Sequence, residues 1–436
     1  MTASQHWIHK RWGRLPAGLW IWLAVVVLVC VLFFCWFCVR RQLVEFRPQH
    51  RFGIHDPAFF GSAHALADPV PLAGNRITLL NNGDEIFPAM LGAIHAAKRS
   101  VNFEAYLLWT GTVGSEFRDA LCERAQAGVP VRVLLDGIGS GLSLDNSYVD
   151  AMRKAGCHFS YFHPTHSWRI DRMNRRSHRR VLVVDGTLGF TGGVGFADEW
   201  QGHAEAPEHW RDVQVRVEGP LVAKLQGAFQ QHWTRSTGEV MQGPEYFPAL
   251  APVGNLRAQM IASQSFSIAA LPLAQATAVA AAERRIWITN PYWTPGKDQV
   301  ELLVEAVKRG VDVQVLVPGK DDNHATTKAA GRTAYGQLLE AGVKVFEYQP
   351  TMIHSKLMVV DGMFSIVGSS NLDTRSAQIN EELDLTVYDE TFGAELEKTF
   401  MKDLEQARPY TLEEFKKRGP WERFHEWLIA PFRSQL

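Results

Sequence analysis

The chain has 436 residues, which is long for one compact domain and comfortable for two. Its 45 Lys and Arg residues balance 46 Asp and Glu residues, and this argues against a dedicated nucleic-acid-binding protein, because such proteins usually carry a strong basic excess. Outside one apolar run near the amino end only Cys122 and Cys157 remain, and since they form no C-x-x-C pair, neither a disulfide framework nor a zinc site is indicated.

Residues 19–39 are that apolar run, with 21 uncharged residues and no interruption. A helix rises about 1.5 Å per residue and needs about 20 residues to cross a bilayer core of about 30 Å, so the run predicts a transmembrane helix. A cleaved signal peptide would have a shorter apolar region and a small-residue cleavage site, and a buried core helix would not need such a run. We therefore expect a short basic segment over residues 1–18 and an uncleaved anchor after it. Basic residues flank the run on both sides, so they do not choose its orientation.

An irregular stretch with scattered Pro, Gly and His predicts a linker over residues 40–74. Helix and strand patterns then alternate along the chain. Apolar spacing predicts a helix over residues 84–99, and apolar runs predict strands over residues 101–109 and 129–137. Gly128 closes another helix just before the second strand, as glycine often does. This alternation implies an α/β layered fold.

A later part of the chain repeats this order of elements. The stretches AQAGVPVRVLLDG and VKRGVDVQVLVPG share their apolar pattern and the position of a glycine. We therefore predict a duplicated unit, with halves over residues 75–237 and 253–408. Independent βαβ crossovers could look alike by convergence, but both halves end at a strand that follows a histidine, and this shared endpoint favours duplication.

The tail over residues 409–436 is predicted to form an amphipathic helix. Trp421, Phe424, Trp427 and Leu428 fall on one face of that helix. Such a stripe usually packs into a core, and the alternative is a role at a membrane interface.

Each half carries the same pattern of a histidine, a cationic residue two positions later and an aspartate seven positions later. The two sets are His178, Arg180 and Asp185, and His354, Lys356 and Asp361. Side chains two apart on a strand share a face, so each histidine and its cation can face one phosphate. One such pattern is weak evidence, since on the order of a few per cent of chains this long contain one by chance. Two copies in matching contexts predict one shared active site where the halves meet.

Two neighbouring stretches are further candidates. The turn over residues 368–371 offers Ser369, Ser370 and Asn371 as donors to phosphate oxygens. The basic run over residues 172–180 either steers anionic headgroups towards the site or forms a solvated face.

The doubled motif resembles the signature of the phospholipase D superfamily, and within it the sequence is most similar to bacterial cardiolipin synthases. The resemblance covers about residue 74 to the carboxyl end, and its most specific stretch is HSKLMVVDGMFSIVGSSNLDTRSAQINEE. It implies a duplicated phospholipase D fold, in which two α/β sandwich halves form one bilobed catalytic unit behind an N-terminal transmembrane helix. It also implies single-pass location in the bacterial inner (cell) membrane, with phosphatidylglycerol and other anionic phospholipids as partners. No cofactor, metal or nucleic acid is expected, and the oligomeric state is left open.

The same resemblance implies phosphatidyl transfer between two phosphatidylglycerol molecules, with release of glycerol and a phosphohistidine intermediate. It makes His178 the nucleophile and His354 the acid that protonates the leaving alkoxide, although the reverse assignment stays open. Arg180 and Lys356 would hold the non-bridging oxygens. The carboxylates at the family positions that orient the histidines are Asp212 and Glu382.

The first copy of the motif departs from the family pattern at two positions. Arg180 replaces a lysine, and Gly195 stands where the pattern has an asparagine, which the second copy keeps as Asn371. Arginine keeps the charge and can hold phosphate with two donors, so we expect an active enzyme. The alternatives are a weakened donor site, a phospholipase D-type hydrolase or nuclease on the same fold, and a non-catalytic anchored protein with a degraded first motif.

Overall fold

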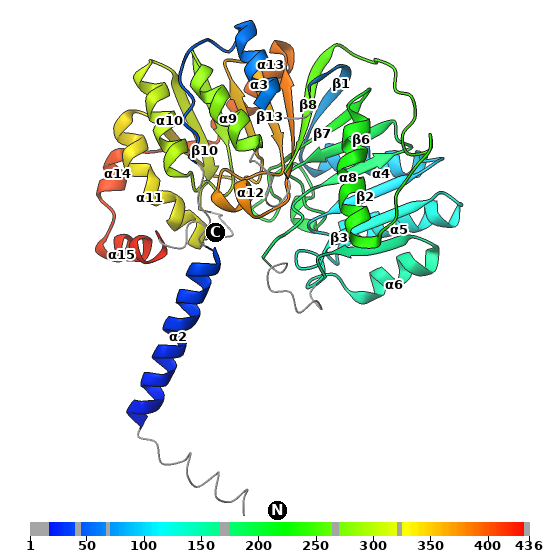
Figure 1. The fold of residues 1–436 in the computed structure, drawn as a ribbon, viewed down its shortest axis with the longest axis horizontal. Helices are drawn as coiled ribbons and strands as arrows, with labels where there is room; N and C mark the ends of the chain where they lie inside the picture. The colour runs from blue at the N-terminus through cyan, green and yellow to red at the C-terminus, as the bar shows by residue number, and fades with distance from the viewer. Residues whose placement is uncertain are drawn as a thin grey trace, which may run out of the picture. The chain divides into compact units, whose positions relative to one another are not determined.

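The structure is a computed structural model of the chain in two units, residues 1–45 and residues 46–436. The residues that it describes are 17–39, 45–66, 70–164, 174–263, 270–320 and 325–430. In the first unit, helix α2 covers Ala17–Val39 (Figure 1). Within the described residues, no helix combines the length and the apolar character that crossing a membrane requires. The transmembrane helix over residues 19–39 therefore stays a prediction, and residues 1–16 of the predicted basic segment lie outside the described residues.

The second unit is built on one sheet of 15 strands, in the order β15-β11-β10-β9-β12-β13-β14-β8-β1-β7-β6-β5-β2-β3-β4. The first-half strands are β1 Leu72–Asn81, β2 Val101–Ala105, β3 Val131–Asp136, β4 His158–Phe162, β5 Val181–Val184, β6 Leu188–Gly192 and β7 Val213–Glu218. The second-half strands are β8 Leu256–Ala262, β9 Arg285–Thr289, β10 Asp312–Pro318, β11 Lys344–Tyr348, β12 Leu357–Val360, β13 Phe364–Gly368, β14 Leu383–Tyr388 and β15 Ala407–Tyr410. Read outward from the central β8–β1 pair, both halves have the same strand order, with β15 added at one edge. The fold is thus mixed α/β, with one continuous sheet through both halves.

Helices cover the faces of this sheet (Figure 1). In the first half they are α4 Asn82–Ala96, α5 Thr112–Gln126, α6 Asn146–Ala155, the 3-10 helix η1 Asp198–Trp200 and α8 Val222–Thr237. In the second half they are α9 Ala270–Ala281, α10 Lys297–Lys308, α11 Ala325–Ala341, α12 Thr374–Gln378 and α13 Glu390–Leu404, and the tail adds α14 Leu412–Lys416 and α15 Pro420–Ile429. Strands β2 and β3 run parallel and are buried along their whole length, because helices lie on both of their faces. Their continuous apolar sequences reflect this double covering.

The predicted linker contains a helix that belongs to the core. Helix α3, Pro57–Leu66, lies within the stretch that the sequence predicts to be irregular. Phe59 is fully buried, and its ring lies 5.9 Å from Phe364 and 6.4 Å from Tyr388. Contacts with distant strands thus stabilise a helix that its local sequence does not signal.

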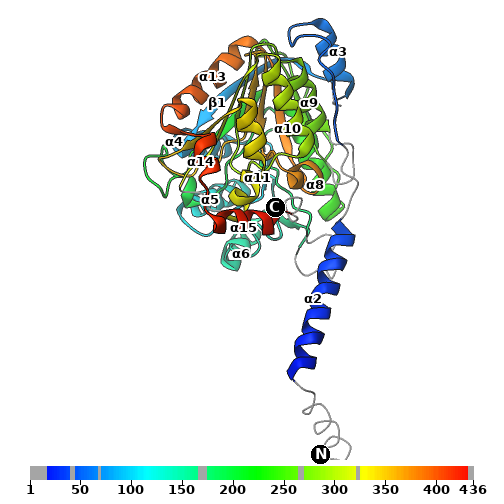
Figure 2. The ribbon, with the colours of Figure 1, turned by 90° about the vertical axis from the view of Figure 1, so that its left-hand side faces the viewer.

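The aromatic stripe of the tail is exposed, so the expectation that it packs into a core is wrong. Trp421 is 75% exposed and Trp427 is 70% exposed. The opposite face of α15 holds the helix on the body, since Ile429 is buried and Glu426 pairs with Arg418. Both views of the ribbon place α15 at the lower end of the second half (Figures 1 and 2).

Candidate active site

The two motif histidines lie just before β5 and β12, where the halves touch. Short parallel bridges across this contact hold both backbones. The amide of His178 donates to the carbonyl of Glu381 at 2.9 Å, and the amide of His354 donates to the carbonyl of Arg211 at 2.7 Å. Each acceptor comes from the opposite half and immediately precedes a carboxylate residue. The backbone contact between the halves therefore sets where those two carboxylates lie.

Each histidine is held by the carboxylate of the opposite half. His178 Nδ1 lies 2.8 Å from Glu382 Oε2, and His354 Nδ1 lies 2.8 Å from Asp212 Oδ2. All four side chains are buried. A carboxylate on Nδ1 favours the tautomer that carries its proton there, and it fixes the orientation of the ring. Neither half alone supplies both members of the His178–Glu382 or the His354–Asp212 pair.

A buried cation lies against the other ring nitrogen of each histidine. Arg180 Nη2 is 3.1 Å from His178 Nε2, while Lys356 Nζ lies beside both ring nitrogens of His354, 3.1 Å from Nε2 and 3.0 Å from Nδ1. Each cation also donates to the carbonyl of its own histidine, which keeps the two groups on one face of the chain. An Nε2 that accepts a hydrogen bond carries a lone pair, so it can attack phosphorus or take up a proton.

Burial and the two cations lower the pKa of both histidines. Burial, followed by the charge of Arg180, lowers the pKa of His178 to about 4. Burial, followed by the charge of Lys356, lowers the pKa of His354 to about 3. Burial also lowers the pKa of Lys356 itself to about 7. A phosphodiester anion bound between the cations would oppose their repulsion and raise the pKa of both imidazoles.

Both orienting carboxylates stay ionised although they are buried. Burial works against ionisation of Asp212, but the contact with His354 and the charge of Lys356 outweigh it and lower the pKa of Asp212 to about 2. Burial opposes ionisation of Glu382 in the same way, and its contact with His178 lowers its pKa. Among the described residues, no group of three or more His, Cys, Asp or Glu side chains is arranged to hold a metal ion.

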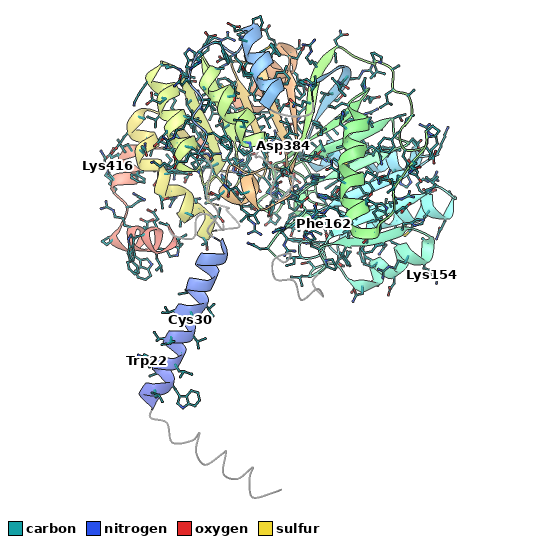
Figure 3. The ribbon with its side chains drawn as sticks, in the orientation of Figure 1. Trp22, Cys30, Lys154, Phe162, Asp384 and Lys416 are labelled. Carbon is teal, nitrogen blue, oxygen red and sulfur yellow. The ribbon has the colours of Figure 1, made fainter. Side chains whose placement is uncertain are left out.

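The serines of the 368–371 turn contact carboxylates. Ser369 Oγ donates to Glu382 Oε2 at 2.6 Å, and the Ser370 hydroxyl donates to Asp384 on β14, which is labelled near the middle of Figure 3. These partners depart from the predicted phosphate contacts, because each hydroxyl proton is already bound within the protein. Asn371 differs, since its Oδ1 is buried without a hydrogen-bond partner in the described part of the chain.

Asp185 and Asp361 lie at the far ends of β5 and β12, away from the histidines, and this departs from their predicted grouping with the catalytic residues. Asp185 accepts from the amides of residues 98–100, and Asp361 accepts from those of residues 283–285, at 2.7 to 3.1 Å. Their φ angles are 55° and 53°, and a glycine follows each. An Asp-Gly pair in this conformation is typical of tight hairpin turns. Both aspartates therefore fix the turn that follows each motif strand.

The described part of the basic run, residues 174–180, is largely buried, which departs from both predicted roles. Arg179 and Arg180 are 0% and 1% exposed, and Arg176 is 4% exposed. Arg179 donates to the carbonyls of Ala228 on α8 and of Ser263 just after β8, so it ties the chain before β5 to both segments. Residues 165–173 lie outside the described residues.

Three buried side-chain contacts hold the residues that precede the orienting carboxylates. His232 on α8 lies 2.6 Å from Glu104 and 2.7 Å from Glu381, and Arg211 lies 2.8 Å from Asp403 on α13. The residue before each orienting carboxylate is thus fixed to a helix of the opposite half. Sequence reasoning missed these contacts because no motif or spacing marks them.

Aromatic rings pack against both imidazoles. Tyr106 lies 4.9 Å from His178, while Trp200 and Trp210 lie 5.2 and 5.7 Å from His354, between ring centroids. Both tryptophans come from the segment between β6 and β7, whose tryptophans and histidines the sequence offers either as the lining of an entrance or as ordinary loop packing.

Comparisons with known proteins agree with this geometry. The family model described as "Cardiolipin synthase, PLD-like domain" matches residues 90–233 and 276–404. A cardiolipin synthase of Halalkalibacterium halodurans is 34% identical over 405 residues, which cover 89% of this chain and 77% of that protein. Cardiolipin synthase A of Pseudomonas syringae pv. syringae is 36% identical over 353 residues, which cover 79% of this chain and 71% of that protein. A solved phosphatidylserine synthase of Haemophilus influenzae has a TM-score of 0.64 at 14% identity, covering 86% of this chain and 100% of its own, and this likeness shows the fold alone.

Proposed function

This chain belongs to the phospholipase D-like family of cardiolipin synthases, and from that premise we propose that it joins two phosphatidylglycerol molecules into cardiolipin and releases glycerol. The observation that carries the proposal is the pair of buried histidines, His178 and His354. Each has a carboxylate on Nδ1 and a cation beside Nε2. Such a pair can divide a transfer reaction between a nucleophile and a proton carrier.

In the first step, His178 Nε2 attacks the phosphorus of the donor lipid. An N–P bond forms while the P–O bond to the headgroup glycerol breaks, and protonated His354 gives its Nε2 proton to the leaving oxygen. Glu382 stabilises the positive charge that develops on the His178 ring. Arg180 and Lys356 bind the non-bridging oxygens and balance their negative charge.

The donor lipid itself supplies the conditions for that proton transfer. In the free site, burial and the charge of Lys356 keep the pKa of His354 low. The phosphodiester anion neutralises part of the local positive charge, so His354 takes up a proton as the substrate binds. Asp212, ionised and 2.8 Å from Nδ1, then stabilises the imidazolium.

In the second step, neutral His354 removes a proton from a headgroup hydroxyl of the acceptor phosphatidylglycerol. The resulting alkoxide attacks phosphorus, the N–P bond to His178 breaks, and cardiolipin leaves. Both histidines return to their starting protonation states, so the cycle balances. Water in place of the acceptor would give phosphatidic acid, and the low exposure of His178 and His354, 8% and 4%, restricts that reaction.

We also propose that residues 19–39 anchor the chain in the bacterial inner membrane and that α15 contacts the membrane surface. The support is the sequence, in which residues 19–39 form an uninterrupted run of 21 uncharged residues. The exposed rings of Trp421, Phe424 and Trp427 form a row along α15, with centroids 5.8 and 6.0 Å apart. Tryptophan and phenylalanine favour the membrane interface, where both lipid substrates lie.

The test is to incubate the purified full-length protein with phosphatidylglycerol in mixed micelles, without added metal, and to measure products by mass spectrometry. We expect cardiolipin and glycerol from the wild type and neither from His354→Ala. Phosphatidic acid alone would indicate a hydrolase, and no product from a folded wild-type protein would contradict the proposal.

A further inference from the structure

Gly195, which stands where the family pattern has an asparagine, makes room for Trp200. A Cβ atom added at Gly195 would lie 2.7 Å from Cη2 and 2.8 Å from Cζ3 of the Trp200 indole. Trp200 is 1% exposed, so its ring cannot swing into solvent without leaving a cavity. A side chain at position 195 and this placement of the indole therefore exclude each other.

The indole that fills this space donates to one of the orienting carboxylates. Trp200 Nε1 lies 2.9 Å from Asp212 Oδ2, the same oxygen that holds His354 Nδ1 at 2.8 Å. In the opposite half a hydroxyl takes the place of the indole. Ser369 Oγ lies 2.6 Å from Glu382 Oε2, the oxygen that also holds His178 Nδ1. In both halves one carboxylate oxygen thus accepts from an imidazole and from a second, buried donor.

The first half cannot supply that second donor from the matching position of its own turn. Gly193 stands where the other half has Ser369, and a Cβ atom there would lie 2.5 Å from Asp212 Oδ1. The donor has to come from elsewhere in the fold, and Trp200, from η1 just after this turn, provides it.

We propose that Trp200 is a positioning residue for the proton-transfer histidine and does for Asp212 what Ser369 does for Glu382. The inference rests on the proposed function, in which His354 carries the proton. Indole N–H is only a donor, so it can hold an ionised carboxylate but cannot compete with it for the imidazole proton. The rigid ring also lies edge-on to His354, which limits how the carboxylate and the imidazole can turn. Gly195 is then part of a working alternative arrangement, and the first motif is not degraded by it.

Trp200→Phe tests the inference, because it keeps an aromatic ring and removes the donor. Ser369→Ala is the matched variant, since it removes the second donor from the other carboxylate. Each full-length protein is assayed with phosphatidylglycerol and with a phosphatidyl p-nitrophenyl ester, whose leaving group needs no acid. The p-nitrophenolate burst counts active sites, so any misfolded fraction is removed from the comparison.

We expect Trp200→Phe to lower cardiolipin formation per active site about tenfold, the effect of one lost hydrogen bond to a charged group, and to leave the burst rate near that of the wild type. Ser369→Ala should slow the burst itself. Gly195→Ala, which displaces the indole, should reproduce the Trp200→Phe pattern. Unchanged turnover of phosphatidylglycerol by Trp200→Phe would overturn the inference. So would an equal loss of rate with phosphatidylglycerol and with the p-nitrophenyl ester. A wild-type protein that forms no cardiolipin would instead refute the proposed function.

Discussion

Asp212→Asn should stop turnover of phosphatidylglycerol while leaving the formation of the covalent intermediate possible. Asp212 lies in the first half, but its carboxylate holds His354 of the second half. An asparagine of nearly the same shape keeps the packing and changes the hydrogen bond. Its amide N–H donates to Nδ1, so the imidazole proton moves to Nε2, the atom that must receive the proton of the acceptor hydroxyl.

The expected loss is large because no solvent can substitute for the carboxylate. The His354 and Asp212 side chains are 5% and 1% exposed, and the contact between them is 2.8 Å long. An equivalent aspartate-to-asparagine change behind a catalytic histidine costs about 10⁴ in kcat in serine proteases, so we expect a loss of about 10³ to 10⁴ here. Glu382→Gln should cause a loss of similar size through the other histidine.

A phosphatidyl p-nitrophenyl ester separates the two variants. Its leaving group departs without an acid, so Asp212→Asn should still release a burst of p-nitrophenolate when rapidly mixed with this donor. Glu382→Gln should release it slowly, because the nucleophile His178 has lost its partner. Circular dichroism controls for folding of both variants.

The opposite pattern would refute this reasoning. If Asp212→Asn abolished the burst and Glu382→Gln preserved it, the roles of the two histidines would be reversed. If both variants turned over phosphatidylglycerol at nearly the wild-type rate, the contacts between the halves would not matter for catalysis.

Three further predictions follow from the site and its surroundings. The pKa of Lys356 is lowered to about 7, so the side chain is charged below that pH and neutral above it. Above about pH 7, kcat/KM should therefore fall more steeply than the loss of the His354 proton alone makes it fall. Lys356→Arg should remove this added steepness, and a break near pH 7 that persists in the variant would contradict the assignment. Asp361→Ala should lower the free energy of unfolding in urea by about 1–3 kcal/mol, and by more than Asp185→Ala does, because the three amide partners of Asp361 are less exposed. Both variants should keep the wild-type kcat at a permissive temperature. A loss of kcat in folded protein would restore a catalytic role for the aspartate. Brominated lipids in phosphatidylglycerol vesicles should quench the fluorescence of the exposed Trp421 and Trp427. Their contribution is measured as the difference from a Trp421→Ser/Trp427→Ser variant. Equal quenching of both proteins would show that α15 does not touch the bilayer.

The sequence was enough to predict features that repeat or follow a local rule. The doubled pattern of His178 and His354 marked the site, and the apolar periods of residues 84–99 and 129–137 indicated α/β layers that the structure has. The Asp185-Gly186 pair also predicts the hairpin turn that the structure has, since this dipeptide between apolar strands is typical of such turns. Its place in the doubled motif instead led to the prediction that Asp185 belongs to the active site.

Other features depend on contacts between distant segments, which a single sequence does not display. The backbone bridges between the halves decide which carboxylate holds which histidine. They place Glu382 of the second half beside His178 and Asp212 of the first half beside His354. The role of Gly195 is visible only once the Trp200 indole is seen to fill the space beside it. Helix α3 exists because Phe59 reaches a core formed about 300 residues later, near Phe364.

The central claim, that one histidine carries the lipid phosphate while the other moves protons, is tested most directly by locating the covalent adduct. His354→Ala is mixed with the phosphatidyl p-nitrophenyl ester, quenched in alkali to preserve phosphohistidine, digested and measured by peptide mass spectrometry. Because this variant lacks the base that activates an acceptor, the adduct should accumulate on the peptide that contains His178. A variant that releases p-nitrophenolate without any adduct on His178 would contradict the account.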